Sequence, residues 1–276
     1  MKTFVLSSIV FVLAMFCGQA QAFLVSYWSF DTDFTADEGG SGFDLTAVNG
    51  ATAGDPGGKF GNAASFECAN GEYAFTGGDV LTAGEDFSYS AWHKLGVDPE
   101  LGIVGGDRYF VLETTLNDTP SGDQAWVASI GLRDLGAGDV VQVFYSPSAA
   151  VGDTPAALGV WQNVTVTYDA DGGTNSGGIV NAYLDGSGTP FATLDDTPAS
   201  NPVSGLVIGG HRAGTGRNFD GQVDAVSFYD HVLSSDEITG LQTAPFVSSV
   251  IPEPSSVVLI GLGSLVAVSL LRRRQS

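Results

Sequence analysis

Acidic residues supply most of the side chains that could do chemistry in this chain, with 31 Asp and Glu against 10 Lys and Arg and 3 His. Two carboxyl groups about 5 Å apart can cleave a glycosidic bond, and alternate positions of one strand can hold them at that spacing. Asp31 and Asp33 instead end a predicted strand, and Asp169 and Asp171 lie in a predicted turn. We therefore predict that the chain is not an enzyme, with an atypical glycan-active hydrolase or lyase as the alternative.

Other nucleophiles and zinc ligands are sparse. His93, His211 and His231 are scattered without zinc-ligand spacing, and the nucleophile motif Gly-x-Ser-x-Gly does not occur. Cys68 is the only cysteine after residue 22, so an internal disulfide cannot form there. We predict that Cys68 and His93 are buried residues of short strands.

The N-terminus has the pattern of a secretory signal. Residues 1–22 begin with Lys2, continue with the apolar run 4–17 and end with Ala20-Gln21-Ala22. A charged start, an apolar core and a small-residue cleavage site are the three parts of such a signal. We predict that residues 1–22 are removed during export.

The C-terminus has three parts in a fixed order. Pro252, Glu253 and Pro254 precede an uncharged apolar run of 17 residues, 255–271, and the cluster Arg272, Arg273 and Arg274 follows. This length is at the short limit for a membrane helix, which needs roughly 17–25 residues. The arginines would hold their end of such a helix in the cytoplasm.

This arrangement resembles the PEP-CTERM sorting tail of bacterial exported proteins. The resemblance implies processing by an exosortase, a transient anchor in the inner membrane, and a final place at the cell surface or in the extracellular matrix of a Gram-negative bacterium. We predict a signal peptide at 1–22, one domain at 23–245 and the sorting tail at 246–276. A plain C-terminal membrane anchor is the alternative.

The exported segment is strongly acidic. Residues 23–251 hold 30 acidic and 6 basic side chains, a net charge of −24. Such a surface repels nucleic acid and anionic lipid, so we exclude both as partners of the domain. It is compatible with divalent cations and with solubility outside the cell.

Short segments rich in aromatic and β-branched residues, separated by Gly, Asp and Asn turns, predict an all-β protein. The predicted strands are 24–30, 60–66, 72–75, 87–94, 108–113, 125–130, 140–145, 161–168, 180–186, 206–210 and 219–229. Segments 39–58 and 146–159 are predicted to be mostly loop. One helix, 234–241, is predicted from the capping box that Ser234 and Glu237 can form.

Alternation along 87–94 predicts a strand with two distinct faces. Phe87, Tyr89 and His93 share one face with Ala91, and Trp92 lies on the opposite face with Ser88, Ser90 and Lys94.

Several spaced motifs resemble the LamG-like domains of the concanavalin A-like lectin/glucanase superfamily. They are Tyr27-Trp-Ser-Phe-Asp31, Gly58-Lys-Phe-Gly-Asn-Ala63, Phe87-Ser-Tyr-Ser-Ala-Trp92, and the segments 161–168, 180–186, 206–210, 219–229 and 233–238. The resemblance implies an all-β, concanavalin A-like jelly-roll sandwich of two antiparallel sheets. An N-terminal signal helix and a C-terminal transmembrane helix would flank this sandwich.

Some members of this family bind calcium at the rim of the sandwich, which implies a possible structural calcium here. Asp31, at the end of the first strand, and Asp224, in the last, are the candidate ligands, since these strands can lie side by side in a jelly roll. Asp224 is predicted to point inward along an apolar strand and to need a partner there. The alternative partner is the backbone of a neighbouring loop. No other cofactor is expected.

Aromatic side chains are the candidates for stacking on sugars. The family resemblance places Trp28, Trp92 and Trp161 in the core. Trp126 lies in the part of the chain that matches the family least and is the best single candidate for a surface aromatic, although core packing is the favoured interpretation.

The segment around residues 211–218 is a second candidate ligand site. It gathers His211, Arg212, Arg217 and Asn218 in an otherwise acidic domain, which makes it a candidate anion or polysaccharide contact. A solvated loop is the favoured interpretation.

These observations favour a non-catalytic protein that binds or structures an extracellular polysaccharide or surface glycan. A protein-binding adhesion module is the alternative from another class. A contiguous aromatic strip on one sheet face would favour carbohydrate binding.

Overall fold

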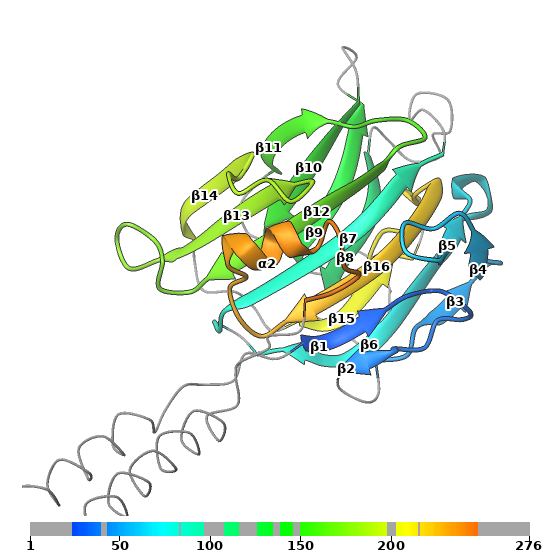
Figure 1. Ribbon diagram of the computed structural model, residues 1–276, viewed down its shortest axis with the longest axis horizontal. Coiled ribbons are helices and arrows are strands. Elements are labelled where there is room, and N and C mark those ends of the chain that lie inside the picture. The colour runs from blue at the N-terminus through cyan, green and yellow to red at the C-terminus, as the bar shows by residue number, and fades with distance from the viewer. Residues whose placement is uncertain are drawn as a thin grey trace, which may run out of the picture. The chain divides into compact units, whose positions relative to one another are not determined.

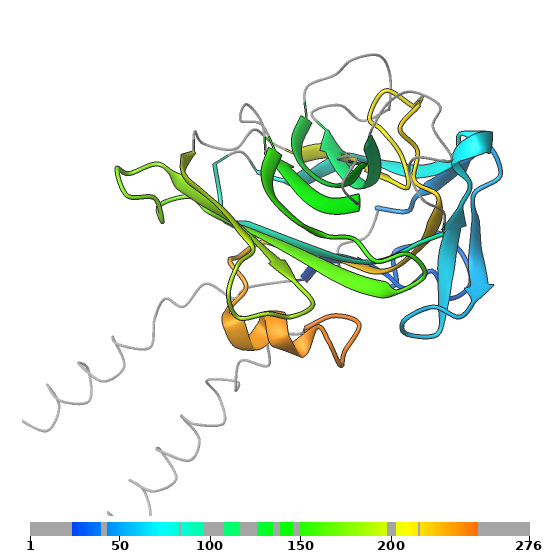
Figure 2. The same ribbon diagram turned by 90° about the horizontal axis from the view of Figure 1, so that it is seen from above.

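Two antiparallel sheets form separate layers in the computed structural model of the chain, and one short helix lies against the outside of the larger sheet (Figures 1 and 2). The structure describes residues 24–39, 43–82, 84–96, 108–115, 126–134, 139–145, 150–197, 203–214 and 216–247. They belong to one compact unit, Phe23–Val247, which carries its own hydrophobic core. The predicted all-β sandwich is confirmed, whereas the predicted signal helix and transmembrane helix lie outside the described residues.

Sheet A has nine strands within the described residues. They are β1 Leu24–Trp28, β2 Glu38–Gly39, β4 Thr52–Pro56, β5 Asn62–Phe66, β7 Phe87–Leu95, β12 Trp161–Asp169, β13 Gly178–Leu184, β14 Ala192–Thr197 and β16 Gly221–Tyr229. Seven of them follow the order β14-β13-β12-β7-β16-β1-β2, and β5 pairs with both β16 and β4. The first and last strands lie side by side, as predicted, because β1 pairs with β16.

Sheet B has seven strands in the described part of the chain. They are β3 Thr46–Val48, β6 Tyr73–Leu81, β8 Arg108–Thr115, β9 Trp126–Asp134, β10 Asp139–Tyr145, β11 Ala150–Pro155 and β15 Val203–Ile208. Their order is β11-β10-β9-β8-β15-β6-β3.

The main core fills the space between the sheets. Phe87, Tyr89 and Ala91 of β7 belong to it, so the predicted alternation of β7 is correct. Trp28 and Phe228 meet there edge to face, with ring centroids 6.3 Å apart. Aromatic pairs in this geometry stabilise a core beyond the apolar area that they bury.

Helix α2, Ser235–Gly240, covers part of the outer face of sheet A, the face turned away from sheet B (Figure 2). Its predicted capping box is present: the Ser234 side chain accepts from the Glu237 backbone N–H, and the Glu237 side chain accepts from the Ser234 backbone N–H. Leu233 and Ile238 join Tyr229 in a second buried cluster, which holds the helix against the sheet.

The strand predictions missed elements that have little apolar alternation. Segment 39–58, predicted to be mostly loop, contains β3 and β4, and segment 146–159 contains β11. Strand β14 was not predicted at all. The residues of β4 are half-buried or exposed, and this strand exists because β5 supplies its hydrogen bonds. Cys68 is buried as predicted, but it begins a short 3-10 turn, Cys68–Asn70, instead of lying in a strand.

Candidate functional site

Two carboxylates from adjacent strands hold the turn between β4 and β5. Asp31, just after β1, accepts a hydrogen bond through Oδ1 from the Asn62 backbone N–H at 2.7 Å, and its carbonyl accepts from the Asn62 side chain at 2.8 Å. Asp224 of β16 accepts through Oδ2 from the Phe60 backbone N–H at 2.8 Å. The structure therefore brings the two candidate calcium ligands to one turn, although 193 residues separate them in sequence.

Asp224 is fully buried, and it lies on the outer face of sheet A instead of between the sheets. It stands opposite Trp92 in the pairing of β16 with β7, at a bulge where Ala225 has a φ of 48°. The prediction that it points into the sandwich is therefore wrong, because Asp224 follows the core residue Val223 in regular alternation, and the bulge after it places Ala225 on the same outer face. Burial raises the pKa of the Asp224 carboxyl to about 6, and the charge of Asp31 adds to this shift. Its Oδ1 is buried without a hydrogen-bond partner.

These residues fit a calcium ion only in part. Asp31 and Asp224 offer hard carboxylate oxygens, and the unpartnered Oδ1 of Asp224 is an open ligand position. The described residues contain no group of three or more His, Cys, Asp and Glu side chains that could hold a metal. A calcium ion at this turn would therefore need backbone carbonyls and water for most of its ligands.

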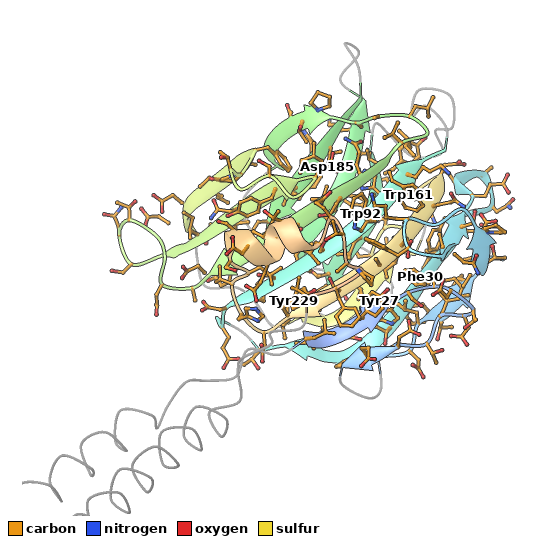
Figure 3. The ribbon with its side chains drawn as sticks, viewed as in Figure 1. Tyr27, Phe30, Trp92, Trp161, Asp185 and Tyr229 are labelled. Atoms are coloured by element: carbon orange, nitrogen blue, oxygen red, sulfur yellow. The ribbon has the colours of Figure 1, made fainter. Side chains whose placement is uncertain are left out.

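Five aromatic side chains form a continuous strip on the outer face of sheet A, which we call the aromatic surface: Tyr27, Phe60, Trp92, Trp161 and Phe246. The rings of Phe60 and Trp92 meet edge to face with centroids 6.0 Å apart, and those of Tyr27 and Phe246 lie 4.7 Å apart. Figure 3 shows Trp92 and Trp161 side by side between α2 and the β4–β5 hairpin. Trp92 is buried, whereas Phe60, Trp161 and Phe246 are partly exposed.

The indole nitrogens of the aromatic surface bind backbone carbonyls, which fixes the rings. Trp161 Nε1 donates to the Gly57 carbonyl at 3.2 Å, and Trp92 Nε1 donates to the Leu241 carbonyl at 3.3 Å. The turn of the β4–β5 hairpin and the segment after α2 therefore border the surface. Next to Trp161 along the chain, Leu158 and Val160 are 57% and 53% exposed, which extends the apolar character of this region.

Both lysines of the exported segment stand on the aromatic surface. Lys59 Nζ lies 3.9 Å from the centroid of the Trp92 ring, and Lys94 Nζ lies 5.7 Å from that of Trp161. Ammonium groups over indole faces are attracted by the negative face of the ring. Lys94 also donates to Gln222 Oε1 at 2.9 Å. Neither lysine forms an ion pair with another residue that the structure describes.

The predicted core positions of the tryptophans are correct for Trp28 alone. Trp28 lies between the sheets, whereas Trp92 and Trp161 lie on the outer face of sheet A. The alternation of 87–94 already grouped Trp92 with Lys94 and the serines, opposite Phe87 and Tyr89. The alternation alone therefore predicts an outward Trp92, whereas the family resemblance placed this residue in the core.

His211 and Arg212 belong to a buried ionic cluster instead of an exposed loop tip. Glu113 of β8 is fully buried, and its carboxylate accepts from Arg212 Nη1 at 2.7 Å and from the Arg212 backbone N–H at 2.6 Å. Burial raises the pKa of the Glu113 carboxyl, and the guanidinium opposes this shift. His211 is 7% exposed, and its Nε2 lies 2.9 Å from Arg212 Nη1. This cluster joins β8 to the loop after β15.

Asn218 and Arg217, the other two predicted ligand-binding residues of this loop, bind different parts of the protein and do not form one site with His211 and Arg212. Asn218 is buried, and its side chain donates to the Glu72 carbonyl at 2.9 Å. Arg217 is half-buried, and its carbonyl accepts from the Phe110 backbone N–H at 3.1 Å. Trp126 begins β9, and its side chain lies outside the described part of the structure.

Burial raises the pKa of three carboxyl groups among the described residues, those of Glu113, Asp220 and Asp224, and the charge of Glu72 adds to the shift of Asp220. Glu113 belongs to sheet B, Asp224 belongs to sheet A, and Asp220 directly precedes β16 of sheet A. Asp220 Oδ2 accepts a hydrogen bond from the Cys68 backbone N–H at 3.2 Å, so this carboxylate has a structural partner.

The sorting motif lies beyond the last described residue, Val247. This applies to Pro252, Glu253, Pro254, Arg272, Arg273 and Arg274. In the described part of the chain, no helix has both the length and the apolar character that crossing a membrane requires.

A sandwich of a seven-stranded and a nine-stranded antiparallel sheet within the described residues defines a jelly-roll-like class of domain. Residues 69–239 match the family model of the concanavalin A-like lectin/glucanases superfamily, and the chain belongs to this family. Residues 250–275 match the PEP-CTERM protein-sorting motif. Both resemblances found in the sequence are thus confirmed, and the chain is an exported protein sorted to the cell envelope or surface. No curated protein matches the chain.

Solved structures show the same fold at low sequence identity. Domain 4 of AbnA, a GH43 extracellular arabinanase from Geobacillus stearothermophilus solved with arabinotriose, has a TM-score of 0.57 and 16% identity, with 81% of this chain and 100% of that chain covered. Trypanosoma rangeli sialidase has a TM-score of 0.55 and 16% identity, over 82% of this chain and 34% of the sialidase. The binding domain of Paraclostridial Mosquitocidal Protein 1 has a TM-score of 0.55 and 14% identity, over 79% and 51%.

Proposed function

We propose that this protein is delivered to the cell surface or extracellular matrix, where its domain binds extracellular carbohydrate without catalysis. The observation that carries the proposal is the aromatic surface. Trp161, Phe60 and Phe246 present partly exposed rings on one sheet face, and the indole hydrogen bonds fix the two tryptophans. Rigid aromatic rings with a few placed polar groups are the usual lining of a ligand site.

The proposed route to the surface depends on the tail. An exosortase would process the chain at the Pro-Glu-Pro tail while the apolar run holds it in the inner membrane of a Gram-negative bacterium. The match of residues 250–275 to the sorting motif supports this route.

A binding measurement with the domain, residues 23–251, tests the proposal. We expect saturable binding to the exopolysaccharide of the host and its loss in Trp161→Ala. Phe75→Ala is the matched control, because Phe75 is also a partly exposed aromatic residue but lies on sheet B. Unchanged binding by Trp161→Ala would contradict the proposed site.

Exposure of Leu158 and Val160 favours one second candidate, a protein-binding adhesion module. If the domain binds no saccharide but captures a surface protein, and Leu158→Ser abolishes the capture, adhesion replaces carbohydrate binding. Product release from a saccharide would instead support the enzymatic alternative.

We also propose a structural calcium ion between Asp31 and Asp224. The two carboxylates at one turn and the unpartnered Oδ1 of Asp224 support it. A ligand that binds only the folded state raises its melting temperature by mass action. Calcium should therefore raise the melting temperature and EDTA lower it, with no response in Asp224→Asn. An identical melting temperature with calcium and with EDTA would show that the folded domain binds no calcium ion there.

A further inference from the structure

Lys59 and Lys94 are the only lysines in the exported segment, and both stand beside the tryptophans of one surface. In so acidic a domain, many carboxylates are available to pair with its few cations. Among the described residues, both ammonium groups instead contact aromatic rings, and one of them also contacts a neutral amide. Both side chains are partly exposed, so an external ligand can approach them.

Two nearby carboxylates accept hydrogen bonds from groups other than the lysines. Asp224 Oδ2 accepts from the Phe60 backbone, and Asp55 Oδ2 accepts from Gln222 Nε2 at 2.7 Å. Gln222 in turn accepts from Lys94, so a neutral amide separates Lys94 from the nearest hydrogen-bonded acid. This arrangement leaves the charge of both lysines available to an anion from outside the chain.

The sheet register sets these groups in a compact pattern. Trp92 and Lys94 occupy alternate positions of β7 and are therefore about 7 Å apart along the strand. Lys94 lies between Trp161 of β12 and Gln222 of β16 in one cross-strand row. Lys59 reaches the same place from the β4–β5 turn. A ligand on Trp161 would thus meet positive charge on two sides.

We infer that the aromatic surface binds an acidic saccharide, one that carries uronate carboxylates. This inference rests on the proposed carbohydrate binding and adds the class of sugar. The pyranose face would stack on Trp161, and its carboxylate would pair with Lys94 and Lys59. The net charge of −24 repels a long polyanion, but at physiological salt charges more than about 8 Å apart are largely screened. The fitting ligand is therefore a short acidic stretch within a polysaccharide.

The test compares a trisaccharide of galacturonic acid with its neutral galactose counterpart, using the tryptophan fluorescence of the 23–251 domain. We expect the acidic trisaccharide to bind at least about tenfold more tightly, with a preference that fades at high salt. In the double variant Lys59→Met and Lys94→Met, the affinities for the acidic and the neutral trisaccharide should become about equal, because methionine keeps the side-chain length without the charge. Lys59→Arg with Lys94→Arg should keep it.

A matched control separates local from overall charge. Thr82→Glu with Thr189→Glu changes the net charge by the same two units at exposed positions. This control should keep the preference. An equal loss in the control and in the methionine pair would overturn the inference, since a diffuse field would then explain the preference.

Amine modification gives a second readout on the unaltered domain. Reductive methylation labels only Lys59, Lys94 and the N-terminus, and bound acidic trisaccharide should slow labelling of both lysines by severalfold. Equal binding of the two trisaccharides, abolished by Trp161→Ala, would overturn the acidic specificity and leave carbohydrate binding intact. Failure of both trisaccharides and of the host polysaccharide to bind would overturn both proposals.

Discussion

Burial shifts the pKa values of His93 and Asp224, and the two shifts make stability depend on pH in opposite directions. His93 lies in the core with both ring nitrogens unpaired, and burial lowers its pKa to about 4 from 6.5. The contribution of His93 to the free energy of unfolding is complete above pH 6.5. It is lost as the pH falls towards 4, because the unfolded chain takes up the proton more readily than the folded one. The pKa of Asp224 rises from 3.8 to about 6, so its contribution is complete below pH 3.8 and is lost as the pH rises towards 6.

His93→Leu should separate the two effects. We expect this variant to be more stable than the wild type at pH 4, by an excess that shrinks by roughly 3 kcal/mol between pH 4 and 6.5. Urea denaturation across this range measures the difference, and titrations common to both proteins cancel. Asp224→Asn is the opposing control, because its stability relative to the wild type should grow between pH 4 and 6. A constant difference for His93→Leu would show that the imidazole is solvated.

At the scale of elements, the Glu113–Arg212 pair joins β8 to the loop after β15. The guanidinium and the Arg212 backbone N–H both bind the Glu113 carboxylate, and the Ser129 hydroxyl adds a bond of 3.3 Å. Removal of one member of a buried pair leaves an uncompensated charge, which costs about 3–5 kcal/mol.

Arg212→Met should therefore lower the free energy of unfolding by about 3–5 kcal/mol at pH 7. Arg217→Met is the matched control in the same loop, and its side chain has no ion pair among the described residues, so we expect a change within about 0.5 kcal/mol. Glu113→Gln combined with Arg212→Met should recover most of the loss. Equal effects of both single substitutions in a denaturation experiment would exclude a specific role for the pair.

Two glycines of the β4–β5 hairpin allow steric crowding to be separated from backbone strain. Gly57 and Gly61 have φ values of 93° and 98°, in the left-handed region that favours glycine. A Cβ atom at Gly57 would meet open space, whereas one at Gly61 would clash with the Asp31 carboxylate that holds the turn.

Gly57→Ala should cost about 1–2 kcal/mol from backbone strain alone. Gly61→Ala should cost clearly more, because Asp31 must also move, and it should weaken any response to calcium. Thermal melts with and without EDTA measure both variants. Equal costs would show that the Asp31 contact adjusts freely.

The sequence predicted elements that depend on local patterns and missed those that depend on distant partners. Alternation in β7 and the capping box of α2 are local, and both predictions were correct. Glu113, 99 residues from Arg212, gave no local signal of their pairing. The proximity of Asp31 and Asp224 was predicted only through the expectation that the first and last strands are neighbours. The bulge after Asp224, which places Ala225 on the same outer face, has no sequence marker such as glycine.

At the scale of the whole molecule, the tail and the domain have separate tasks. Deletion of 252–276 should release the protein in soluble form into the periplasm or medium, which cell fractionation detects. Substitution of Pro252, Glu253 and Pro254 by alanine leaves the apolar run intact, and it should keep the protein unprocessed in the inner membrane. A deletion variant that stays bound to cells would show that the tail does not determine its location.

The position of β16 also governs when the exported chain can fold. It lies between β1 and β7 and also pairs with β5, and Leu24 at the start of the domain is the partner of Tyr229 near its end. A chain that crosses the membrane from its N-terminus presents β1 and β5 long before their shared partner arrives. In such a passage, sheet A would close only when translocation is almost complete. Pairings between residues so far apart in sequence form slowly, so the polypeptide would stay unfolded while it crosses the membrane.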